Sequence, residues 1–402
     1  MTHRTTPDIT LDVTIDRIVG DGKGIGFANG KTIFVSRTAP GDHVRARVIR
    51  ANKNVLHAVP EKIYTPSPMR ITPDVEYAER AGAYDFIHIN YPDQLKLKIG
   101  IIEDSLRRIA KLEIWPEINI IASPQQFGYR SRAEFQVSAE NSLVGYFAEN
   151  SNVIVDVPRC PLCNDTVNML LQTLRDDVEA GLVPATAREY RAVAGDFGTA
   201  LEQTTTQRSA TLQQRVGEFD YRFSAECFFQ ANHGIAEELV KGVMRIATQA
   251  RAENGYAVDL YAGVGLFSLP LAKLFKRVLA VESHKPAIAF LKENLEHAGY
   301  TRSKVISTPV EHWVQGDVSK YGRVAMMVFD PPRTGAGAKA IDGMITMNPA
   351  HIAAVSCDPA TFARDLAGLI DGGYQLVNIT AYDMFPQTHH VEILAHLKRA
   401  DV

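Results

Sequence analysis

The chain has 402 residues, of which 46% are hydrophobic and 22% are charged. This length predicts two or three domains, and the composition is that of an ordinary globular protein. No run of about 18 apolar residues is present, which argues against a membrane-spanning helix. The N-terminal segment lacks the apolar core of a signal peptide, so we expect a cytoplasmic protein.

Charge is unevenly distributed along the chain, although the formal net charge is only −3. Residues 1–63 hold ten Lys or Arg and six Asp or Glu, a balance of +4 that leaves −7 for the remainder. A basic N-terminal segment on a mildly acidic body indicates a local anionic partner. The cysteines are too few for a disulfide framework, so each is a candidate metal ligand, reactive thiol or buried apolar residue. They are Cys160, Cys163, Cys227 and Cys357.

Residues 9–59 read as a small all-β module. Short alternating strands with Gly-rich turns and a Pro-Gly-Asp break predict a small barrel. Basic side chains alternate with the apolar positions, which predicts that they face solvent. They form either an ordinary solvated surface or the phosphate-tracking face of an oligonucleotide-binding barrel. These residues are Lys23, Lys31, Arg37, Arg45, Arg47, Arg50 and Lys53.

The middle of the chain mixes strands and helices. A Pro-rich linker at 66–73 precedes an amphipathic helix at 93–111. Strands follow over 127–160, a helix over 165–181, and a further β-rich stretch to about residue 225. From about residue 235, helices alternate with apolar strands, which is typical of a doubly wound, mostly parallel sheet.

The segment DLYAGVGLF lies between a predicted strand and a predicted helix. Gly263 and Gly265 would allow a tight turn and close backbone approach to a ligand, and Glu282 ends the next strand, where it could accept both ribose hydroxyls of an adenosine. Ser268 breaks the Gly-x-Gly-x-x-Gly pattern, and no P-loop Lys-Ser/Thr is present. S-adenosylmethionine, which has no pyrophosphate, therefore fits better than a dinucleotide or ATP; the alternative is a turn that merely joins strand to helix.

Three later blocks carry candidate catalytic groups. VFDPPRTGAG ends a strand with Asp330, followed by two prolines that stiffen the loop. AAVSCDPATFARDL places Cys357 between a strand and a helix, and a thiol near a helix N-terminus is biased toward the nucleophilic thiolate. MFPQTHHVEILAHL carries Glu392 in an apolar stretch, where a carboxylate is either paired or functional. We expect His389 and His390 to be structural, because no third metal ligand stands nearby.

The blocks FFQANH, DLYAGVGLF, FDPPRTG, VSCDPATFARDL and MFPQTHHVE follow the order and similar spacing of the RNA (uracil-5-)-methyltransferase family, which the chain resembles. The resemblance implies an α/β fold in three parts. Residues 8–63 would form a TRAM domain, an OB-like RNA-binding barrel. Residues 64–220 would form a central β-rich RNA-binding domain, with helix 93–111 able to pack on the last domain. Residues 221–402 would form a Rossmann-like class I methyltransferase domain.

The resemblance also implies a reaction, the methylation of carbon 5 of a uridine in RNA with S-adenosylmethionine as donor. Cys357 matches the nucleophile that adds to carbon 6 of the uracil, and Glu392 matches the base that removes the proton from carbon 5. The target base must leave its stack to reach these groups. The residues expected at the cofactor are Gln230, Tyr261, Gly263, Gly265, Glu282 and Asp330.

The sequence departs from the family at a cluster site. Many TRAM-bearing members hold a four-iron, four-sulfur cluster on four cysteines, but Val75, Ala81 and Tyr84 stand at three of those positions and only Cys160 matches the fourth. One or two thiolates cannot hold such a cluster, so we expect neither a cluster nor another metal. A metal site at Cys160 and Cys163 shared between chains is the alternative.

Two further departures concern the cofactor: Leu266 and Pro309 stand where polar residues are common in the family. The TRAM domain favours 23S ribosomal RNA as substrate, whereas the missing cluster admits transfer RNA modified at its T-loop uridine. A non-catalytic RNA-binding protein and a small-molecule methyltransferase are alternatives from other classes. The intact Cys357, Glu392 and Asp330 argue against the first, and the basic barrel argues against the second.

Overall fold

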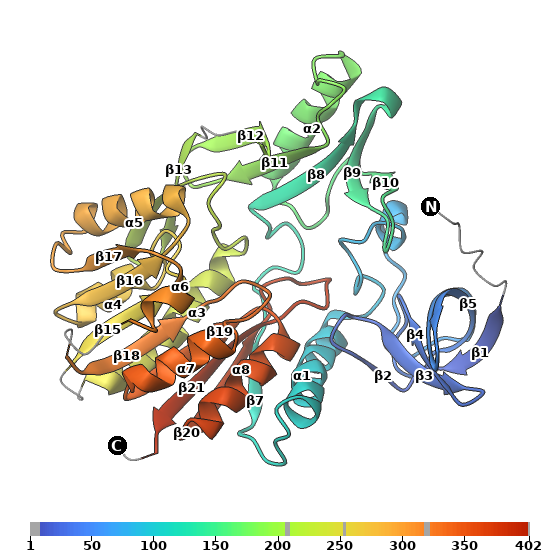
Figure 1. Cartoon of the computed structure of the whole chain (residues 1–402). Coiled ribbons are helices and arrows are strands. Elements are labelled where there is room, and N and C mark those ends of the chain that lie inside the picture. The colour runs from blue at the N-terminus through green and yellow to red at the C-terminus, as the bar shows by residue number, and fades with distance from the viewer. Residues whose placement is uncertain (1–8, 206–209, 252–254, 317–321, 401–402) are drawn as a thin grey trace.

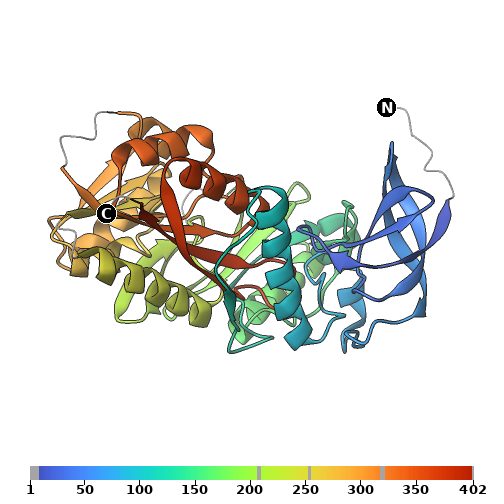
Figure 2. The ribbon, with the colours of Figure 1, turned by 90° about the horizontal axis from the view of Figure 1, so that it is seen from below.

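The computed structural model describes residues 9–205, 210–251, 255–316 and 322–400. The N-terminal segment considered for a signal peptide and Asp8, the first residue of the expected TRAM span, lie outside them. An N-terminal barrel stands at one end of the molecule and a large mixed sheet at the other, with a central sheet and a long helix between them (Figures 1 and 2). No helix of the described ranges has both the length and the apolar character needed to cross a bilayer.

The barrel consists of β1 (Thr10–Thr14), β2 (Arg17–Ile18), β3 (Gly24–Ala28), β4 (Lys31–Val35), β5 (His43–Asn52) and β6 (Val55–Thr65). These described strands lie in the order β1-β5-β6-β4-β3-β2, with β4 and β6 parallel and the other neighbours antiparallel. Alternate residues of β5 point inward, so Val44, Ala46 and Val48 join the core while Arg45 and Arg47 face solvent.

Arg37 departs from the expectation that it faces solvent. Its guanidinium donates hydrogen bonds to the carbonyl oxygens of Ala78 at 3.0 Å and Ala81 at 2.6 Å and lies 3.5 Å from the Glu149 carboxylate. The residue follows β4 in a turn with φ 54°, so the strand alternation that places its neighbours does not extend to it. Arg37 therefore joins the barrel to the middle of the chain.

The central sheet is antiparallel. Its strands are β8 (Arg132–Ser138), β9 (Leu143–Phe147), β10 (Ile154–Asp156), β11 (Glu189–Ala194) and β12 (Thr199–Gln203), and α2 (Asp165–Glu179) packs on it. The described strands lie in the order β10-β9-β8-β11-β12. Leu171 and Leu174 of α2 share a core with Phe135 of β8 and with Cys160 and Cys163. A hairpin of β13 (Thr211–Val216) and β14 (Phe219–Ser224) leads to the C-terminal half.

The large sheet holds β7 (Ile118–Ile121), β15 (Tyr256–Leu260), β16 (Val278–Glu282), β17 (Lys304–Ser307), β18 (Val324–Phe329), β19 (His351–Ser356), β20 (Tyr374–Tyr382) and β21 (Glu392–Arg399). Within the described chain their order is β17-β16-β15-β18-β19-β21-β20-β7. β21 runs antiparallel to β19 and β20, and the other neighbouring pairs are parallel. The expected α/β class with a mostly parallel sheet is confirmed.

Helices cover both faces of the large sheet (Figure 2). Residues of α6 (Val310–Trp313), α7 (Ala338–Met347) and α8 (Pro359–Asp371) share one core with residues of the sheet. Residues of α3 (His233–Ala250), α4 (Ser268–Leu274) and α5 (Lys285–His297) pack in two further cores with the sheet. The inner strands β16, β18 and β19 read as nearly continuous apolar runs because they are buried on both faces.

Two elements from the first half of the chain complete this domain. Ile102 and Leu106 of α1 (Tyr91–Arg108) share a core with Phe362 and Leu366 of α8, and β7 pairs in parallel with β20. Both elements fall inside the expected central span of 64–220. The domain boundaries stay a prediction, but the packing of residues 91–121 belongs to the large sheet.

Candidate active site

The candidate catalytic residues gather at one edge of the large sheet. Asp330 directly follows β18 and Cys357 directly follows β19, so both stand at the carboxyl ends of parallel strands. β21 runs the other way, and its first residue, Glu392, therefore begins at the same edge. Ser356 pairs with Ile393, and one further step of the same register sets Cys357 opposite Glu392.

The Glu392 carboxyl is buried at 3% exposure, and its Oε1 atom has no hydrogen-bond partner among the described residues. Burial and the neighbouring Asp330 raise the pKa of Glu392 well above its usual range. Burial likewise raises the pKa of Asp330 to about 7. A buried carboxyl with an unsatisfied oxygen is costly to keep in a core, which makes Glu392 a candidate functional residue.

Cys357 is half-buried beside these two acids. Burial, followed by the negative charges of Glu392 and Asp330, raises the pKa of its thiol to about 12. The N-terminus of α8 is already satisfied, because Asp358 accepts a hydrogen bond from the Thr361 backbone N–H at 2.8 Å. The thiolate bias expected from the helix N-terminus is therefore wrong for the free protein, in which burial and two carboxylates outweigh the helix.

The glycine turn after β15 takes the shape that its sequence predicts. Gly263 and Gly265 have φ of 54° and 103°, values that favour glycine. A Cβ at Gly265 would lie 2.8 Å from the Leu291 Cδ1 atom, whereas a Cβ at Gly263 would meet open space. Gly263 therefore leaves room at the strand edge, and this room together with exposed backbone suits a nucleoside.

Glu282 ends β16 and orders this turn. Its Oε2 accepts a hydrogen bond from the Gly263 N–H at 2.8 Å, and its Oε1 accepts from the N–H groups of Ser283 at 2.6 Å and His284 at 2.7 Å. Each carboxylate oxygen has further acceptor capacity, so the group is held in place and can still accept ribose hydroxyls.

The other expected cofactor residues surround the same turn. Tyr261 directly follows β15 with φ 61°, and Gln230 is buried shortly before α3. Phe229, next to Gln230, shares a core with Val264 of the turn. The departures from the family are also here: Leu266 accepts a hydrogen bond through its carbonyl from the Tyr221 hydroxyl at 2.9 Å.

Pro309 lies beside Glu282, because the N–H of Thr308 donates to the Glu282 carbonyl oxygen at 3.0 Å and Pro309 follows directly. Pro309 also caps the N-terminus of α6. A proline there offers no N–H, so any polar contact with an adenine at this place must come from another group.

Asp259, near the end of β15, was not among the expected site residues. It is 1% exposed, it accepts a hydrogen bond from the Ser268 hydroxyl at 2.5 Å, and its Oδ1 atom has no partner among the described residues. Burial raises its pKa to about 7. This hydrogen bond joins β15 to the first residue of α4 across the glycine turn. The signal that could have revealed Asp259 in the sequence is an acid inside the apolar strand AVDLY.

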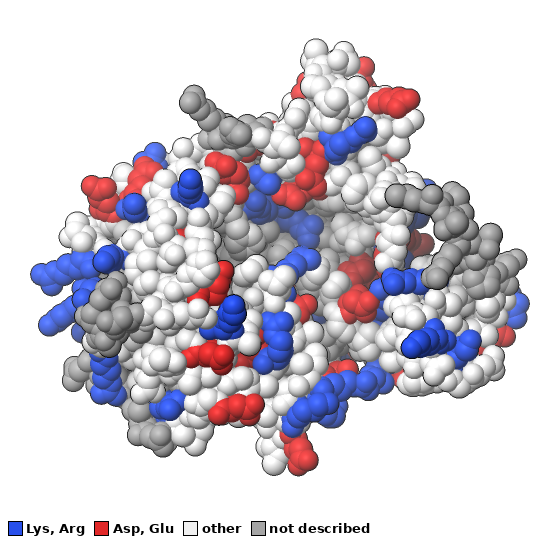
Figure 3. Space-filling model, in the orientation of Figure 1, with Lys and Arg blue, Asp and Glu red and all other residues white. Residues whose placement is uncertain are grey.

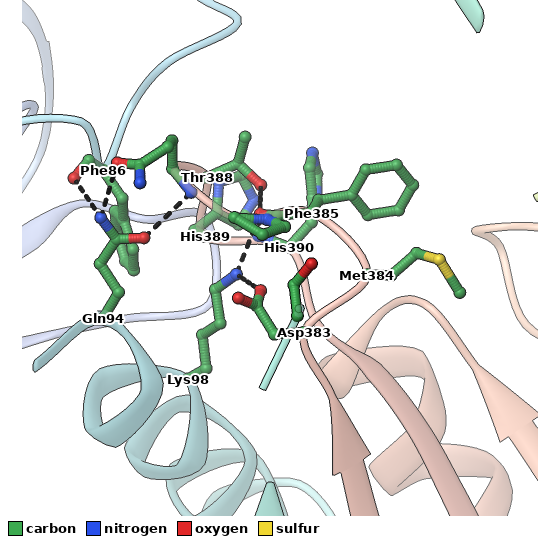
Figure 4. A network of polar contacts seen from close by, with 12 residues as sticks. Phe86, Gln94, Lys98, Asp383, Met384, Phe385, Thr388, His389 and His390 are labelled. Carbon is green, nitrogen blue, oxygen red and sulfur yellow. Dashed lines mark hydrogen bonds and ion pairs between the residues drawn. The ribbon is translucent and has the colours of Figure 1, made fainter. Parts of the chain in front are cut away.

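A loop at 383–391 leads into Glu392 and is held from α1 by buried polar contacts (Figure 4). Lys98 forms an ion pair with Asp383 and donates to the Phe385 carbonyl oxygen at 3.0 Å. The Gln94 amide donates to the Gln387 side-chain oxygen at 2.8 Å and accepts from the Gln387 N–H at 2.9 Å. Such buried groups in a helix so far from the motif could not be assigned from sequence, because only the fold brings α1 to the loop.

His389 is also paired, as its Nδ1 contacts the Asp85 carboxylate and its N–H donates to Asp85 at 3.2 Å. The neighbouring His390 has its pKa lowered to about 3 by burial and the charge of His389. Within the described residues no group of three or more His, Cys, Asp or Glu side chains could hold a metal ion. The structural role expected for the two histidines stays a prediction, and their contacts agree with it.

Cys160 and Cys163 lie together in the central core. The hydroxyl of Tyr84 donates to the Cys160 sulfur at 3.2 Å, and that of Tyr146 donates at 3.4 Å. Burial opposes ionisation of Cys160, but hydrogen bonds from Cys163 and both tyrosines lower its pKa to about 5. Tyr84, at one of the positions where the family resemblance would place a cluster cysteine, thus directs a hydroxyl at Cys160. That the protein carries no cluster stays a prediction.

The Rossmann-like sheet carries a glycine turn after β15, an acid at the end of β16 and a cysteine after β19, and it is joined to an N-terminal barrel. This is the arrangement of a methyltransferase that acts on nucleic acid. The model of the tRNA (Uracil-5-)-methyltransferase family matches residues 197–400, and that of the TRAM domain matches residues 6–60. The chain belongs to the tRNA (Uracil-5-)-methyltransferase family.

Relatives span the whole chain. An uncharacterized RNA methyltransferase of Aquifex aeolicus is 29% identical over 98% of this chain and 100% of its own length. Another from Thermosynechococcus vestitus is 28% identical, with 96% and 98% covered. The structure of Pyrococcus abyssi tRNA (uracil-54, C5)-methyltransferase in complex with S-adenosyl-L-homocysteine superposes with a TM-score of 0.73 at 25% identity, covering 96% of this chain and all of that one. The expected family, TRAM domain and enzyme class are confirmed.

Proposed function

We propose that the protein methylates carbon 5 of a specific uridine in RNA through a covalent bond between Cys357 and the uracil. The observation that carries the proposal is the register that sets Cys357 opposite Glu392 at the sheet edge, with Asp330 ending the adjacent strand. A nucleophile and a proton acceptor are thereby placed side by side at the ends of two neighbouring strands. Covalent catalysis on a planar base needs such a pair.

The reaction follows from these two side chains. The Cys357 thiol releases its proton to solvent and its sulfur adds to carbon 6 of the uracil, and the electron pair displaced from the 5,6 double bond forms an enolate that is nucleophilic at carbon 5. Carbon 5 then takes the methyl group. Glu392 removes the remaining proton from carbon 5, the double bond re-forms, and the sulfur leaves carbon 6. The raised pKa of Glu392 makes its carboxylate a strong base, but the carboxyl must ionise before it can accept this proton.

S-adenosylmethionine supplies the methyl group as an electrophile bonded to a positive sulfur. The open space at Gly263 and the oriented carboxylate of Glu282 fit its nucleoside, and Asp330 lies at the neighbouring strand end. Tyr261, Gly265 and the buried Gln230 complete the set that we assign to it. Pro309 stands where a polar contact with the adenine is expected, so this is the one contact for which we assign no side chain.

The RNA would approach across the barrel and the central sheet. A cleft of about 900 Å³ lies between them and is lined by Arg37, Arg47, Arg70 and Arg80, among others. Arg37 and Arg70 are held by Glu149 and Asp42, whereas Arg47 and Arg80 are exposed. Basic and acidic side chains are interspersed on the face in Figure 3. We therefore expect separate basic side chains, rather than one continuous basic patch, to contact the phosphates of the RNA.

Two RNA substrates are supported by different observations. The TRAM domain favours 23S ribosomal RNA, which is our first candidate. The match to the Pyrococcus tRNA enzyme covers 96% of this chain, including most of the barrel, and therefore favours transfer RNA. Either substrate would place the enzyme in the cytoplasm.

Denaturing gels of enzyme mixed with labelled RNA test the chemistry. Glu392→Gln should accumulate the covalent, methylated adduct and slow the release of methylated RNA by about 10²–10⁴-fold, the range for a lost general base. Cys357→Ala should form no adduct and no product. An adduct with the Ala variant would disprove the assignment of the nucleophile.

Transfer of labelled methyl groups to unmodified transcripts identifies the substrate. Label recovered as 5-methyluridine from 23S ribosomal RNA alone would support the first candidate. Label recovered from transfer RNA alone would establish the second, and no label in either would refute the proposed reaction for both.

A further inference from the structure

We infer that the N-terminal barrel is a positioning element for the base Glu392, because its turn at Gly22 braces the Asp85–His389 pair in the loop that leads to that residue. The inference rests on the proposed function, in which Glu392 takes the proton from carbon 5. It adds to the barrel a role besides contact with RNA.

The turn at Gly22 is in close contact with the Asp85–His389 pair. Gly22 is buried and has φ 74°. A Cβ placed on it would lie 2.5 Å from the Asp85 Oδ2 atom and 2.8 Å from the His389 Cβ atom, distances that real side chains do not adopt. The glycine therefore allows the barrel backbone to close on both residues at once.

Hydrogen bonds within the turn hold its backbone in place. The N–H of Gly22 donates to the Val19 carbonyl oxygen at 2.8 Å, and the N–H of Val19 donates to the Lys23 carbonyl oxygen at 2.9 Å. Ile18, next in the chain, shares a small core with Phe86 of the Asp85 segment and Ile101 of α1. The barrel is thus anchored by apolar packing directly beside the point where it meets the pair.

The pair connects the turn to the catalytic loop. Asp85 contacts both the ring Nδ1 and the backbone N–H of His389, and the Phe86 N–H donates to the Gln387 carbonyl oxygen at 3.0 Å. Although burial alone would raise the pKa of Asp85, the hydrogen bond and charge of His389 lower it, which is the behaviour of an engaged carboxylate. His389 precedes Glu392 by only three residues, so a shift of the pair moves the start of β21.

The loop therefore has two supports. Lys98 and Gln94 hold it from α1, as Figure 4 shows, and Asp85 holds its last part with the barrel behind. The first support lies within the large-sheet domain, whereas the second depends on a module that comes from the other end of the chain. Displacing the barrel turn should loosen residues 385–392 while leaving the Lys98 contact intact.

The test compares Gly22→Ala with Gly30→Ala in the full chain. Both glycines lie in the barrel with nearly equal φ, 74° and 70°, but a Cβ at Gly30 meets open space. Backbone strain is therefore matched and only the contact differs. Amide hydrogen exchange of residues 385–392 should become about tenfold faster in Gly22→Ala and stay unchanged in Gly30→Ala. Equal exchange in the two variants would overturn the inference.

A catalytic readout separates positioning from loss of stability. In Gly22→Ala, the ratio of covalent adduct to methylated product should rise, because proton removal is slowed more than thiol addition; general loss of fold would lower both together. Asp85→Asn, which adds no volume, should reproduce both effects if Gly22→Ala fails to fold, and an unchanged ratio and exchange in it would refute the inference. Absence of product from the wild type would refute the proposed reaction instead, since the exchange result does not depend on it.

Discussion

The thiol of Cys357 shares its strand edge with two acids that oppose its ionisation. Its pKa is raised to about 12 by burial, Glu392 and Asp330, while burial raises the pKa of Asp330 to about 7. The reactive thiolate is therefore a minor species of the free enzyme. A thiol in this state reacts slowly with electrophiles in solution.

This pKa predicts how Cys357 reacts with iodoacetamide. Only the thiolate is alkylated, and below a pKa of about 12 its fraction rises tenfold for each pH unit, so the rate should climb from pH 7 to pH 9 without a plateau. Asp330→Asn removes a negative neighbour and should speed alkylation in the upper part of this range. Mass spectrometry of the Cys357 peptide gives the rate, with buried Cys227 as internal control.

A plateau near pH 8 would contradict the raised pKa. The sequence predicted Cys357 and Glu392 as site residues from their motifs, and the structure brings them together, but the sequence predicted the opposite sign for the ionisation of the thiol. The raised pKa comes first from burial of the thiol and then from Glu392, which the antiparallel insertion of β21 between β19 and β20 sets opposite the sulfur. No local pattern around Cys357 contains that information.

At the scale of elements, α1 connects the catalytic loop to the large sheet. Its apolar face packs on α8, while Gln94 and Lys98 reach the loop at 383–391. The sequence predicted the helix at 93–111, and the structure begins it at Tyr91, where Asn90 caps it by accepting from the Asp93 N–H. Its partners could not be predicted, because they lie almost 300 residues away in the chain.

Lys98→Met should destabilise the protein by about 3–5 kcal/mol, because both members of the ion pair are fully buried and Asp383 would be left as an uncompensated charge. Lys96→Met is the matched control on the same helix. Lys96 pairs with Asp93 at 2.7 Å but is largely exposed, so its loss should cost less than about 1 kcal/mol. Urea unfolding measures both, and equal losses would contradict this account.

At the scale of the whole molecule, some basic side chains of the barrel form ion pairs and others are exposed without one. Arg37 and Arg70 hold the barrel in place through Glu149 and Asp42, and Arg45 pairs with Asp12. Exposed basic residues of the barrel that have no ion pair within the described ranges are Lys31, Arg47, Arg50, Lys53 and Lys62. The sequence predicted that all seven basic residues from Lys23 to Lys53 face solvent. Strand alternation indicates on which face of a strand a side chain lies, but not with which residue it pairs.

The salt dependence of RNA binding should follow this division. Replacing Arg47, Arg50 and Lys53 together by Gln should weaken binding and reduce the slope of log affinity against log salt by about 0.7–0.9 for each phosphate that the variant no longer neutralises. Arg45→Gln is the control, because Asp12 already neutralises that charge. Filter binding over a salt series measures the slopes. The same slope for the triple variant and the wild type would exclude this side of the barrel from RNA contact.

The edge position of β7 has a consequence for synthesis of the chain. β7 ends at Ile121 and pairs with β20, which begins at Tyr374, so about 250 residues separate the two partners. At roughly 5–20 residues per second, the ribosome needs about 12–50 s to deliver the second strand. Through that interval α1 and β7 are outside the tunnel with an apolar face and an open strand edge uncovered. A nascent chain of this protein should therefore be a client for chaperones that shield such surfaces, and a C-terminal fragment made without residues 91–121 should lack the strand that closes its sheet.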